Sequence, residues 1–456
     1  MTSMFHRGWI ALIVFIPIIP KVKVLQLSNY PVLLDDFVLL CGVSLGLVKF
    51  VAPGRKYNPL FVSGVGIAFG IFFAYKLIGL LVLALIYPLG DIGDRGSAVL
   101  LDEGLLVSIR VGILLAVYLL LYSYIRSLSD VYRIIKLLIA CMVMVIAVSM
   151  VQYFVLDHPV VTATFRNIHA LSQIIPGVWG LKNPWIDPSA TGHEHLGAFM
   201  VLGLAVSGGV IIHNVPVRRS WRRASIACWL MGVFVLMVCS SRGSWIGAIC
   251  ALGVCVLLAV IRSRKTFVLR GIVLLVLGLG VLYFIGFDFN KHIVSRVEKL
   301  PAILEGKVED DSAKHRLHTL KILLEIFVNK PLVGWGAGGA GRIAEGQIQR
   351  ELVEGGLVGG ILFICILGCC AKIALKVNRL AKSDFARGIS FGYICGLFGL
   401  MGQALFTELF ILPKVIIPFW IIGVIVHRLY FIEIQEGMGV SAEIGVEPSL
   451  VRKNRS

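Results

Sequence analysis

Long apolar blocks, separated by short polar segments, run through almost the whole chain. A hydrocarbon core of ~30 Å needs about 20 helical residues to cross it, and these blocks reach that length repeatedly. The pattern therefore predicts an all-α polytopic integral membrane protein with about twelve transmembrane helices. We expect these helices near residues 8–25, 32–52, 59–80, 105–125, 135–156, 195–213, 225–240, 245–261, 270–287, 357–375, 388–407 and 415–431.

Composition and charge agree with a membrane protein. Of the 456 residues, 58% are hydrophobic and 15% charged, which excludes an ordinary soluble enzyme and a disordered chain. The net charge is +17, and the basic residues gather in alternate short segments, such as 218–223. Such segments lie on the cytoplasmic side, so the distribution of basic residues predicts the membrane topology. We expect the positive charge to contact membrane lipid, and we expect no nucleic-acid partner. Both termini are expected to be cytoplasmic.

The spans and loops predict four regions, with one large periplasmic loop late in the chain. A second, smaller periplasmic loop is expected at 157–194. Within the large loop, residues 313–328 have apolar positions at helical spacing, which predicts an amphipathic helix. The regions are residues 1–287 (transmembrane helices 1–9), 288–356 (the large loop), 357–431 (transmembrane helices 10–12) and 432–456 (a cytoplasmic tail).

The first candidate for chemistry is the short polar segment between the spans at 225–240 and 245–261. It reads Cys-Ser-Ser-Arg-Gly-Ser-Trp and places Ser241 and Arg242 at the outer membrane boundary. A guanidinium there can bind a phosphate through two parallel hydrogen bonds, with a serine hydroxyl adding a donor. The alternative is an interfacial arginine that extends to lipid phosphate.

A second candidate lies in the large loop. Arg316 belongs to the expected amphipathic helix, and a glycine-rich turn containing Trp335 follows that helix. Glycines allow the backbone to approach a ligand closely, and an indole can stack on a sugar ring. The alternative is a surface helix with an ordinary loop, and an aromatic side chain that anchors at the membrane interface.

A third candidate is the polar stretch directly before the span at 357–375, which contains Glu345, Arg350 and Glu354. A carboxylate at a partly desolvated boundary can have its pKa raised toward use as a general base. The alternative is a solvated helix start, where acidic residues interact favourably with the N-terminal dipole.

Taken together and in this order, the three stretches resemble the O-antigen ligase/polymerase family, which includes Wzy-type polysaccharide polymerases and lipid A core ligases. The resemblance rests on SSRGSWIG around Arg242, on the run from Arg316 through KPLVGWGAG, and on LVEGGLVG at 352–359. It implies a metal-independent inner-membrane glycosyltransferase without a cofactor. Its donor would be a glycan on undecaprenyl diphosphate, and its acceptor a second glycan or lipid A core. A chain-length regulator is a conceivable further partner.

The resemblance also implies roles for individual residues. Arg242 and Arg316 match arginines that face the diphosphate and would stabilise its negative charge as it leaves. Counting back from Gly356 places Glu345 where the ligase branch has a histidine. This departure favours a polymerase of O-antigen or exopolysaccharide repeats over a ligase, and it leaves open whether Glu345 or another group is the base.

Residues 191–197 read Thr-Gly-His-Glu-His-Leu-Gly and resemble the start of a span in the same family, with His195 at an asparagine position. The two histidines could in principle bind zinc. Because a spacing of two residues places side chains poorly on one helix face, we expect no metal site. We instead expect His195 to contact substrate, with a role in starting the helix as the alternative. Substrate contact is also expected of Ser241, Arg350, Glu354 and Trp335.

A transporter or flippase for lipid-linked sugars is the competing class of function. Twelve spans and cytoplasmic termini would suit it equally well. Many transporters are built from two similar halves, and the sequence shows no similarity between its halves.

Overall fold

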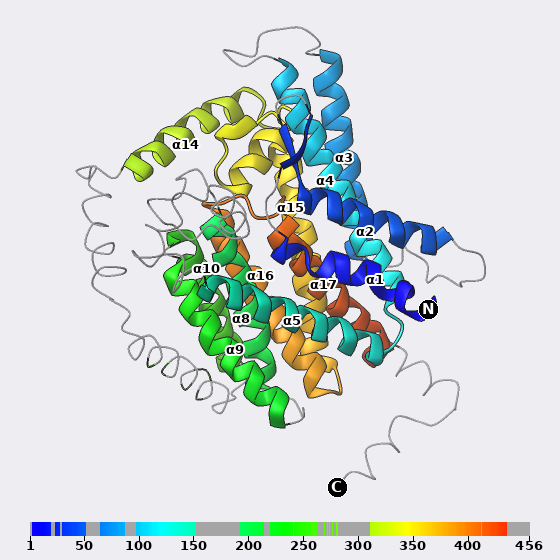
Figure 1. The fold of residues 1–456 in the computed structure, drawn as a ribbon. Helices are drawn as coiled ribbons and strands as arrows, with labels where there is room; N and C mark the ends of the chain where they lie inside the picture. The colour runs from blue at the N-terminus through cyan, green and yellow to red at the C-terminus, as the bar shows by residue number, and fades with distance from the viewer. Residues whose placement is uncertain are drawn as a thin grey trace, which may run out of the picture.

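The computed structural model is an all-α polytopic membrane protein with one small β-hairpin (Figure 1). It describes residues 2–19, 23–27, 30–51, 64–86, 97–151, 192–213, 219–239, 241–261, 311–411 and 413–435, together with Leu269, Gly271, Val273, Val276 and Gly280. The expected loop at 157–194, the span at 270–287 and the tail at 432–456 therefore lie largely outside the described residues.

Helix α16 is at the centre of the second half of the chain and packs against α8, α10, α15 and α17. Small residues allow this close packing, as is common between helices in membranes. A Cβ added to Gly392 of α16 would lie 2.5 Å from the carbonyl oxygen of Ala205 on α8. The helices here are α8 (Gly192–Ile212), α9 (Arg219–Val238), α10 (Arg242–Ile261), α15 (Gln347–Leu380), α16 (Asp384–Ala404) and α17 (Pro413–Tyr430), the last continuing as a π-helical turn (Phe431–Gln435).

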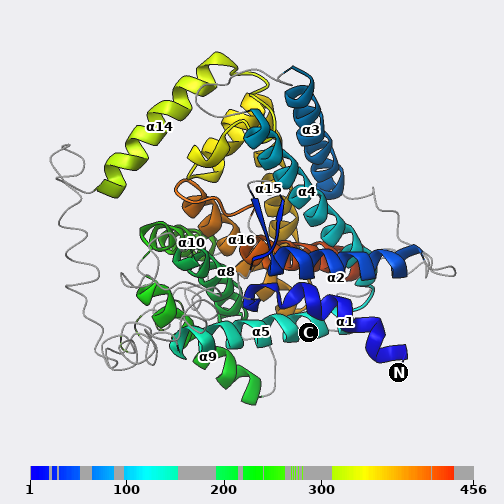
Figure 2. The same ribbon diagram turned by 45° about the horizontal axis from the view of Figure 1, so that its top comes forward.

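In the first half of the chain, the helices at 64–86 and 97–124 pack against α15 and α17, whereas the helix at 128–151 lies beside α9 (Figures 1 and 2). This half contains α1 (Thr2–Val14), a 3₁₀ turn (Ile16–Ile18), the antiparallel strands β1 (Lys23–Leu27) and β2 (Tyr30–Leu33), and the helices α2 (Leu34–Val51), α3 (Gly64–Ile86), α4 (Ser97–Tyr124) and α5 (Leu128–Val151). The first expected span, 8–25, is not one helix. Helix α1 ends at Val14 because Pro17 follows within the 3₁₀ turn, and proline removes a backbone donor.

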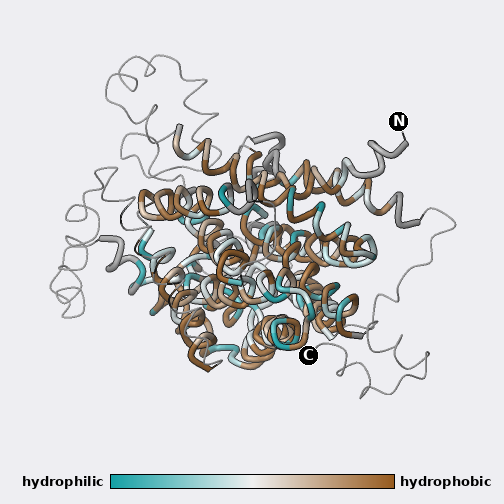
Figure 3. The backbone as a smooth tube through the Cα atoms, turned by 90° about the horizontal axis from the view of Figure 1, so that it is seen from below, coloured by the Kyte–Doolittle hydropathy of each residue, from teal (hydrophilic) through white to brown (hydrophobic). Residues whose placement is uncertain are grey.

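Eight helices in the described part are long and apolar enough to cross a membrane, and Asp36–Leu47 and Ser225–Val238 are shorter apolar helices. The expected count of twelve is therefore not confirmed. Large apolar side chains such as Leu85, Ile249 and Ile361 point outward and are exposed on the protein surface. The tube in Figure 3 is mostly hydrophobic in colour, as expected for helices that lipid surrounds.

Helix α14 (Asp311–Asn329) stands apart from the bundle and lies near the first turns of α15 in both ribbon views (Figures 1 and 2). It covers the expected amphipathic helix at 313–328. A 3₁₀ turn (Gly341–Ile343) follows it before α15 begins. The chain therefore brings α14 and the glycine-rich segment to the same end of the bundle as the start of α15.

Candidate active site

Arg242 is the first residue of α10, and its neighbours explain why the helix starts there. The Ser241 hydroxyl accepts a hydrogen bond of 3.3 Å from the Ser244 backbone N–H, which is the usual task of an N-cap serine. Ser241 is buried, whereas Arg242 is exposed. The Ser-Arg-Gly-Ser sequence thus fixes the helix end and leaves the guanidinium outside it.

Arg316 of α14 lies between two carboxylates. Its Nη2 is 3.1 Å from Oε1 of Glu194, and its Nε is 3.0 Å from Oε2 of Glu345. The side chains of Arg316, Glu194 and Glu345 are 35%, 21% and 32% exposed. This is a charged group at the surface of the bundle that a ligand can reach, and it includes two of the three residues expected to be catalytic.

Glu194 joins this group to the rest of the bundle, although the sequence analysis selected its neighbour His195. The Thr407 hydroxyl donates to Glu194 Oε2 at 3.2 Å, and Gln403 Nε2 donates to the Glu194 carbonyl oxygen at 2.9 Å. Gln403 Nε2 also donates to the Ser244 hydroxyl at 2.9 Å. Glu194 therefore connects α8, α10, α14 and the end of α16. His195 is buried beside it.

Three helices begin at this end of the bundle: α8 at Gly192, α10 at Arg242 and α15 at Gln347. The Ser244 and Glu194 contacts bring the first two together, and the ion pair between Arg316 and Glu345 brings in the third. Each helix start carries partial positive charge. Arg242 and Arg316 add two cationic side chains at this end of the bundle, where the carboxylates of Glu194 and Glu345 also lie.

The glycine-rich segment after α14 fills a break in α15. Gly356 has φ +60° and ψ −160°, which interrupts the helix and leaves backbone groups on both sides of the break without helical partners. Residues 331–336 supply them through four hydrogen bonds of 2.8–3.1 Å, namely Trp335 N–H to Val353 O, Gly336 N–H to Glu354 O, Leu357 N–H to Pro331 O and Val358 N–H to Leu332 O. The close backbone approach that the glycines allow is made to α15.

Trp335 is half-buried and is held from two sides. Its indole N–H donates to the Ile326 carbonyl oxygen of α14 at 2.8 Å, and Lys330 Nζ lies 4.2 Å from the centre of its ring. These contacts dock α14 onto the glycine-rich segment. The expected stacking of Trp335 on a sugar stays a prediction.

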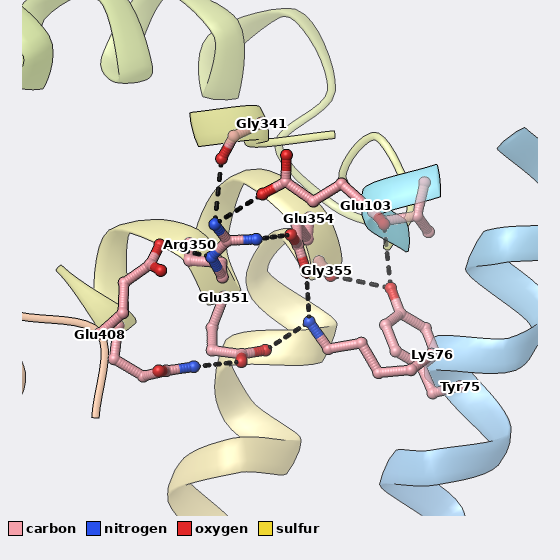
Figure 4. A network of polar contacts seen from close by, with 11 residues as sticks. Tyr75, Lys76, Glu103, Gly341, Arg350, Glu351, Glu354, Gly355 and Glu408 are labelled. Carbon is pink, nitrogen blue, oxygen red and sulfur yellow. Dashed lines mark hydrogen bonds and ion pairs between the residues drawn. The ribbon is translucent and has the colours of Figure 1, made fainter. Parts of the chain in front are cut away.

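Arg350 and Glu354, both expected to bind substrate, lie inside a buried ionic network (Figure 4). Arg350 contacts Glu354 at 2.8 Å, Glu103 of α4 at 2.9 Å and Glu408 at 2.5 Å. Lys76 of α3 lies 2.8 Å from both Glu351 and Glu354. Tyr75 shares its hydroxyl proton between the carbonyl oxygens of Val333 and Gly355, at 3.0 and 2.8 Å. The network thus holds the first turns of α15 against α3 and α4, and the expected contact of Arg350 and Glu354 with substrate stays a prediction.

Glu408 differs from the other members of this network in its accessibility. Its side chain is 20% exposed, whereas those of Lys76, Glu103, Arg350, Glu351 and Glu354 are at most 7% exposed. Desolvation raises the pKa of the Glu408 carboxyl to about 7, against the opposing effect of Arg350, and Glu354 and Glu103 add to the rise. The sequence analysis did not select Glu408, because an isolated glutamate between two spans carries no motif.

One known protein family matches the part of the chain that contains much of the candidate active site. Residues 226–364 match the family model described as O-antigen ligase. The chain is thus similar to the O-antigen ligase family over this segment. The segment covers just under a third of the chain and contains Arg242, Arg316, Glu345 and the broken part of α15, so the expected resemblance is confirmed there. No curated protein matches the chain.

The O-antigen ligase match indicates an enzyme that transfers glycosyl groups in a membrane and acts on a lipid-linked glycan and an acceptor. Glu194, Thr407 and Glu408 lie outside the matched segment. Glu194 nevertheless contacts Arg316 of the matched segment directly, and Thr407 in turn donates to Glu194.

Proposed function

We propose that this protein polymerises lipid-linked glycan repeat units into an O-antigen or exopolysaccharide on the periplasmic face of the bacterial inner membrane. The donor is a glycan on undecaprenyl diphosphate, and the acceptor is the end of a second lipid-linked glycan. The observation that carries the proposal is Arg316, held between Glu194 and Glu345 at the end of the bundle where Arg242 begins α10.

In this mechanism the two arginines bind the diphosphate and replace a divalent cation. An acceptor hydroxyl attacks the anomeric carbon, the bond from that carbon to the diphosphate oxygen breaks, and its electron pair stays on the diphosphate. Guanidinium groups that meet this developing charge lower the barrier. An incoming diphosphate competes with Glu194 and Glu345 for Arg316, so donor binding would free a carboxylate. The sequence leaves open whether Glu345 or another group is the base.

The proposal includes the topology. Helices α8, α10 and α15 begin on the periplasmic side, and the basic segments near 126–136 and 372–387 lie in the cytoplasm, as their charge favours. Both termini are then cytoplasmic, and α14 lies over the outer membrane surface.

The test uses purified protein in detergent or liposomes with a synthetic undecaprenyl-diphosphate oligosaccharide. We expect a ladder of longer lipid-linked glycans from the wild type, and none from Arg242→Ala or Arg316→Ala. Arg133→Ala is the matched control, because Arg133 is exposed and its ion pair in the described part of the chain is with the nearby Asp130, and it should retain the ladder. Normal polymer length in both site variants would disprove the proposed binding of the diphosphate by Arg242 and Arg316.

Two other outcomes separate the competing functions. Transfer of a finished glycan to lipid A core, with no ladder, would identify the ligase reaction instead. Movement of the glycan across the bilayer without a new glycosidic bond would identify a flippase and refute the enzyme.

A further inference from the structure

The structure places a second acidic group at the edge of the candidate active site. Thr407 and Glu408 are consecutive residues whose side chains reach different groups. The Thr407 hydroxyl donates to Glu194, the partner of Arg316, while the Glu408 carboxylate accepts from Arg350 Nε in the buried network. Because neighbouring Cα atoms are only about 3.8 Å apart, the backbone at Glu408 lies beside the cluster that we propose binds the donor.

A contact at Gly346 ties the segment that carries Glu408 to Glu345. A Cβ added to Gly346, the residue after Glu345, would lie 2.6 Å from the Leu405 carbonyl oxygen. Phe410 N–H donates to Gln347 Oε1 at 3.1 Å. Residues 405–410 are thus held against the start of α15 on both sides of Glu408.

The charges around Glu408 favour the protonated form of its carboxyl group. Arg350 is shared by three carboxylates, those of Glu103, Glu354 and Glu408. Glu354 has Lys76 as a second cationic partner, and Lys76 also contacts Glu351. Within the described part of the chain, the ionic contact of Glu408 is to Arg350, and a buried carboxylate with a shared cation gains less from ionisation.

Accessibility separates Glu408 from the rest of this network. A group that exchanges protons with a substrate must be reached by it, and Glu408 is the network member with an appreciably exposed side chain. Glu345 is also exposed, but its carboxylate contacts Arg316, the cation that we propose binds the donor diphosphate, whereas Glu408 contacts Arg350 of the buried network.

On the basis of the proposed function, we propose that Glu408 is the base that accepts the proton of the acceptor hydroxyl. As the hydroxyl oxygen bonds to the anomeric carbon, its proton passes to a Glu408 carboxylate oxygen. The diphosphate leaves with the electron pair of the broken carbon–oxygen bond. Glu408 then releases the proton to water, which restores the carboxylate for the next addition.

The pH profile of elongation tests this assignment. For the wild type, kcat should rise as pH increases through about 7, because the ionised carboxylate is the active form. Glu408→Gln should lower kcat by about 100-fold or more, abolish this rise and leave the donor KM within about twofold. Glu345→Gln should keep the rise. The matched control Glu325→Gln, at an exposed position on α14, should behave as the wild type.

A chemical measurement on the wild type does not depend on the folding of a variant. A carbodiimide adds to a protonated carboxylic acid, which transfers its proton to a carbodiimide nitrogen as its oxygen bonds to the central carbon. Peptide mass spectrometry should show Glu408 labelling that declines as pH rises through about 7. Labelling that is absent or independent of pH would overturn the proposal.

The outcomes distinguish the two proposals. If the wild type elongates glycans and Glu408→Gln keeps the wild-type kcat and pH profile, the assignment of Glu408 is wrong and the polymerase function stands. If Glu345→Gln alone loses the rise, Glu345 is the base. If the wild type forms no longer glycan, the polymerase function fails, and the role of Glu408 in that reaction fails with it.

Discussion

Gly356→Ala tests whether the break in α15, together with its contacts, contributes to the stability of the fold. The backbone at Gly356 has φ +60° and ψ −160°, a region essentially restricted to glycine. A Cβ there would also lie 2.4 Å from the Leu332 carbonyl oxygen. The substitution must therefore either strain the backbone or push residues 331–334 away from α15.

The expected cost follows from these two effects. Holding a non-glycine residue in this conformation costs about 1–3 kcal/mol. Displacing Leu332 weakens the bonds from Leu357 N–H to Pro331 O and from Val358 N–H to Leu332 O, each worth about 0.5–1.5 kcal/mol. We therefore expect Gly356→Ala to lower the free energy of unfolding by about 2–6 kcal/mol.

The assay is unfolding of the purified protein in one detergent by heat or by a denaturing detergent. Gly253→Ala is the control, because a Cβ at Gly253 in the middle of α10 meets nothing within 4 Å, so its effect should stay within about 1 kcal/mol. Gly334→Ala should also destabilise, because a Cβ there would lie 2.5 Å from the Glu354 carbonyl oxygen across the same pairing of the two segments, and the double variant should cost less than the two single costs combined. A Gly356→Ala protein as stable as the wild type would refute this reasoning.

Three further predictions concern the surroundings of the site. Lys76→Met should cost about 3–5 kcal/mol of stability, because it leaves the buried carboxylates of Glu351 and Glu354 with less cationic charge; a melting comparison with exposed Lys321→Met checks it, and equal stability would contradict it. Trp335→Phe should cost about 1 kcal/mol through the lost bond to Ile326 O, seen as faster hydrogen exchange in α14, and unchanged exchange would argue against the docking role. Because the Glu408 pKa is raised from 4.5 to about 7, its contribution to stability is full below pH 4.5 and lost as pH rises through 7; Glu408→Gln should remove this part of the pH dependence, and an identical dependence would exclude it.

Hydropathy predicts much of the fold because a lipid-exposed helix shows its length and polarity in its own sequence. The spans expected at 195–213 and 388–407 correspond to α8 and α16. Hydropathy places the start of α15 at residue 357, ten residues after its actual start at Gln347. The first turns contain Arg350, Glu351 and Glu354, and the groups that neutralise them, Lys76 and Glu103, lie far away in the sequence.

The residues of the candidate site could likewise be predicted from the sequence only in part. Sequence motifs select Arg242, Arg316 and Glu345, and the structure places Arg316 and Glu345 in one ionic group. They do not select Glu194 or Glu408, because the importance of these residues comes from partners on other helices. Hydropathy also does not reveal that Pro17 ends the first apolar block as a helix, or that the glycine-rich segment has backbone partners in α15.

The pairing of residues 331–336 with the interrupted α15 has a consequence for exchanging parts between related enzymes. Neither stretch has a complete set of main-chain hydrogen bonds without the other, so the two form one structural unit although they are separated in the chain. A chimera that imports α14 and its glycine-rich continuation should fold only if it imports the first half of α15 from the same parent.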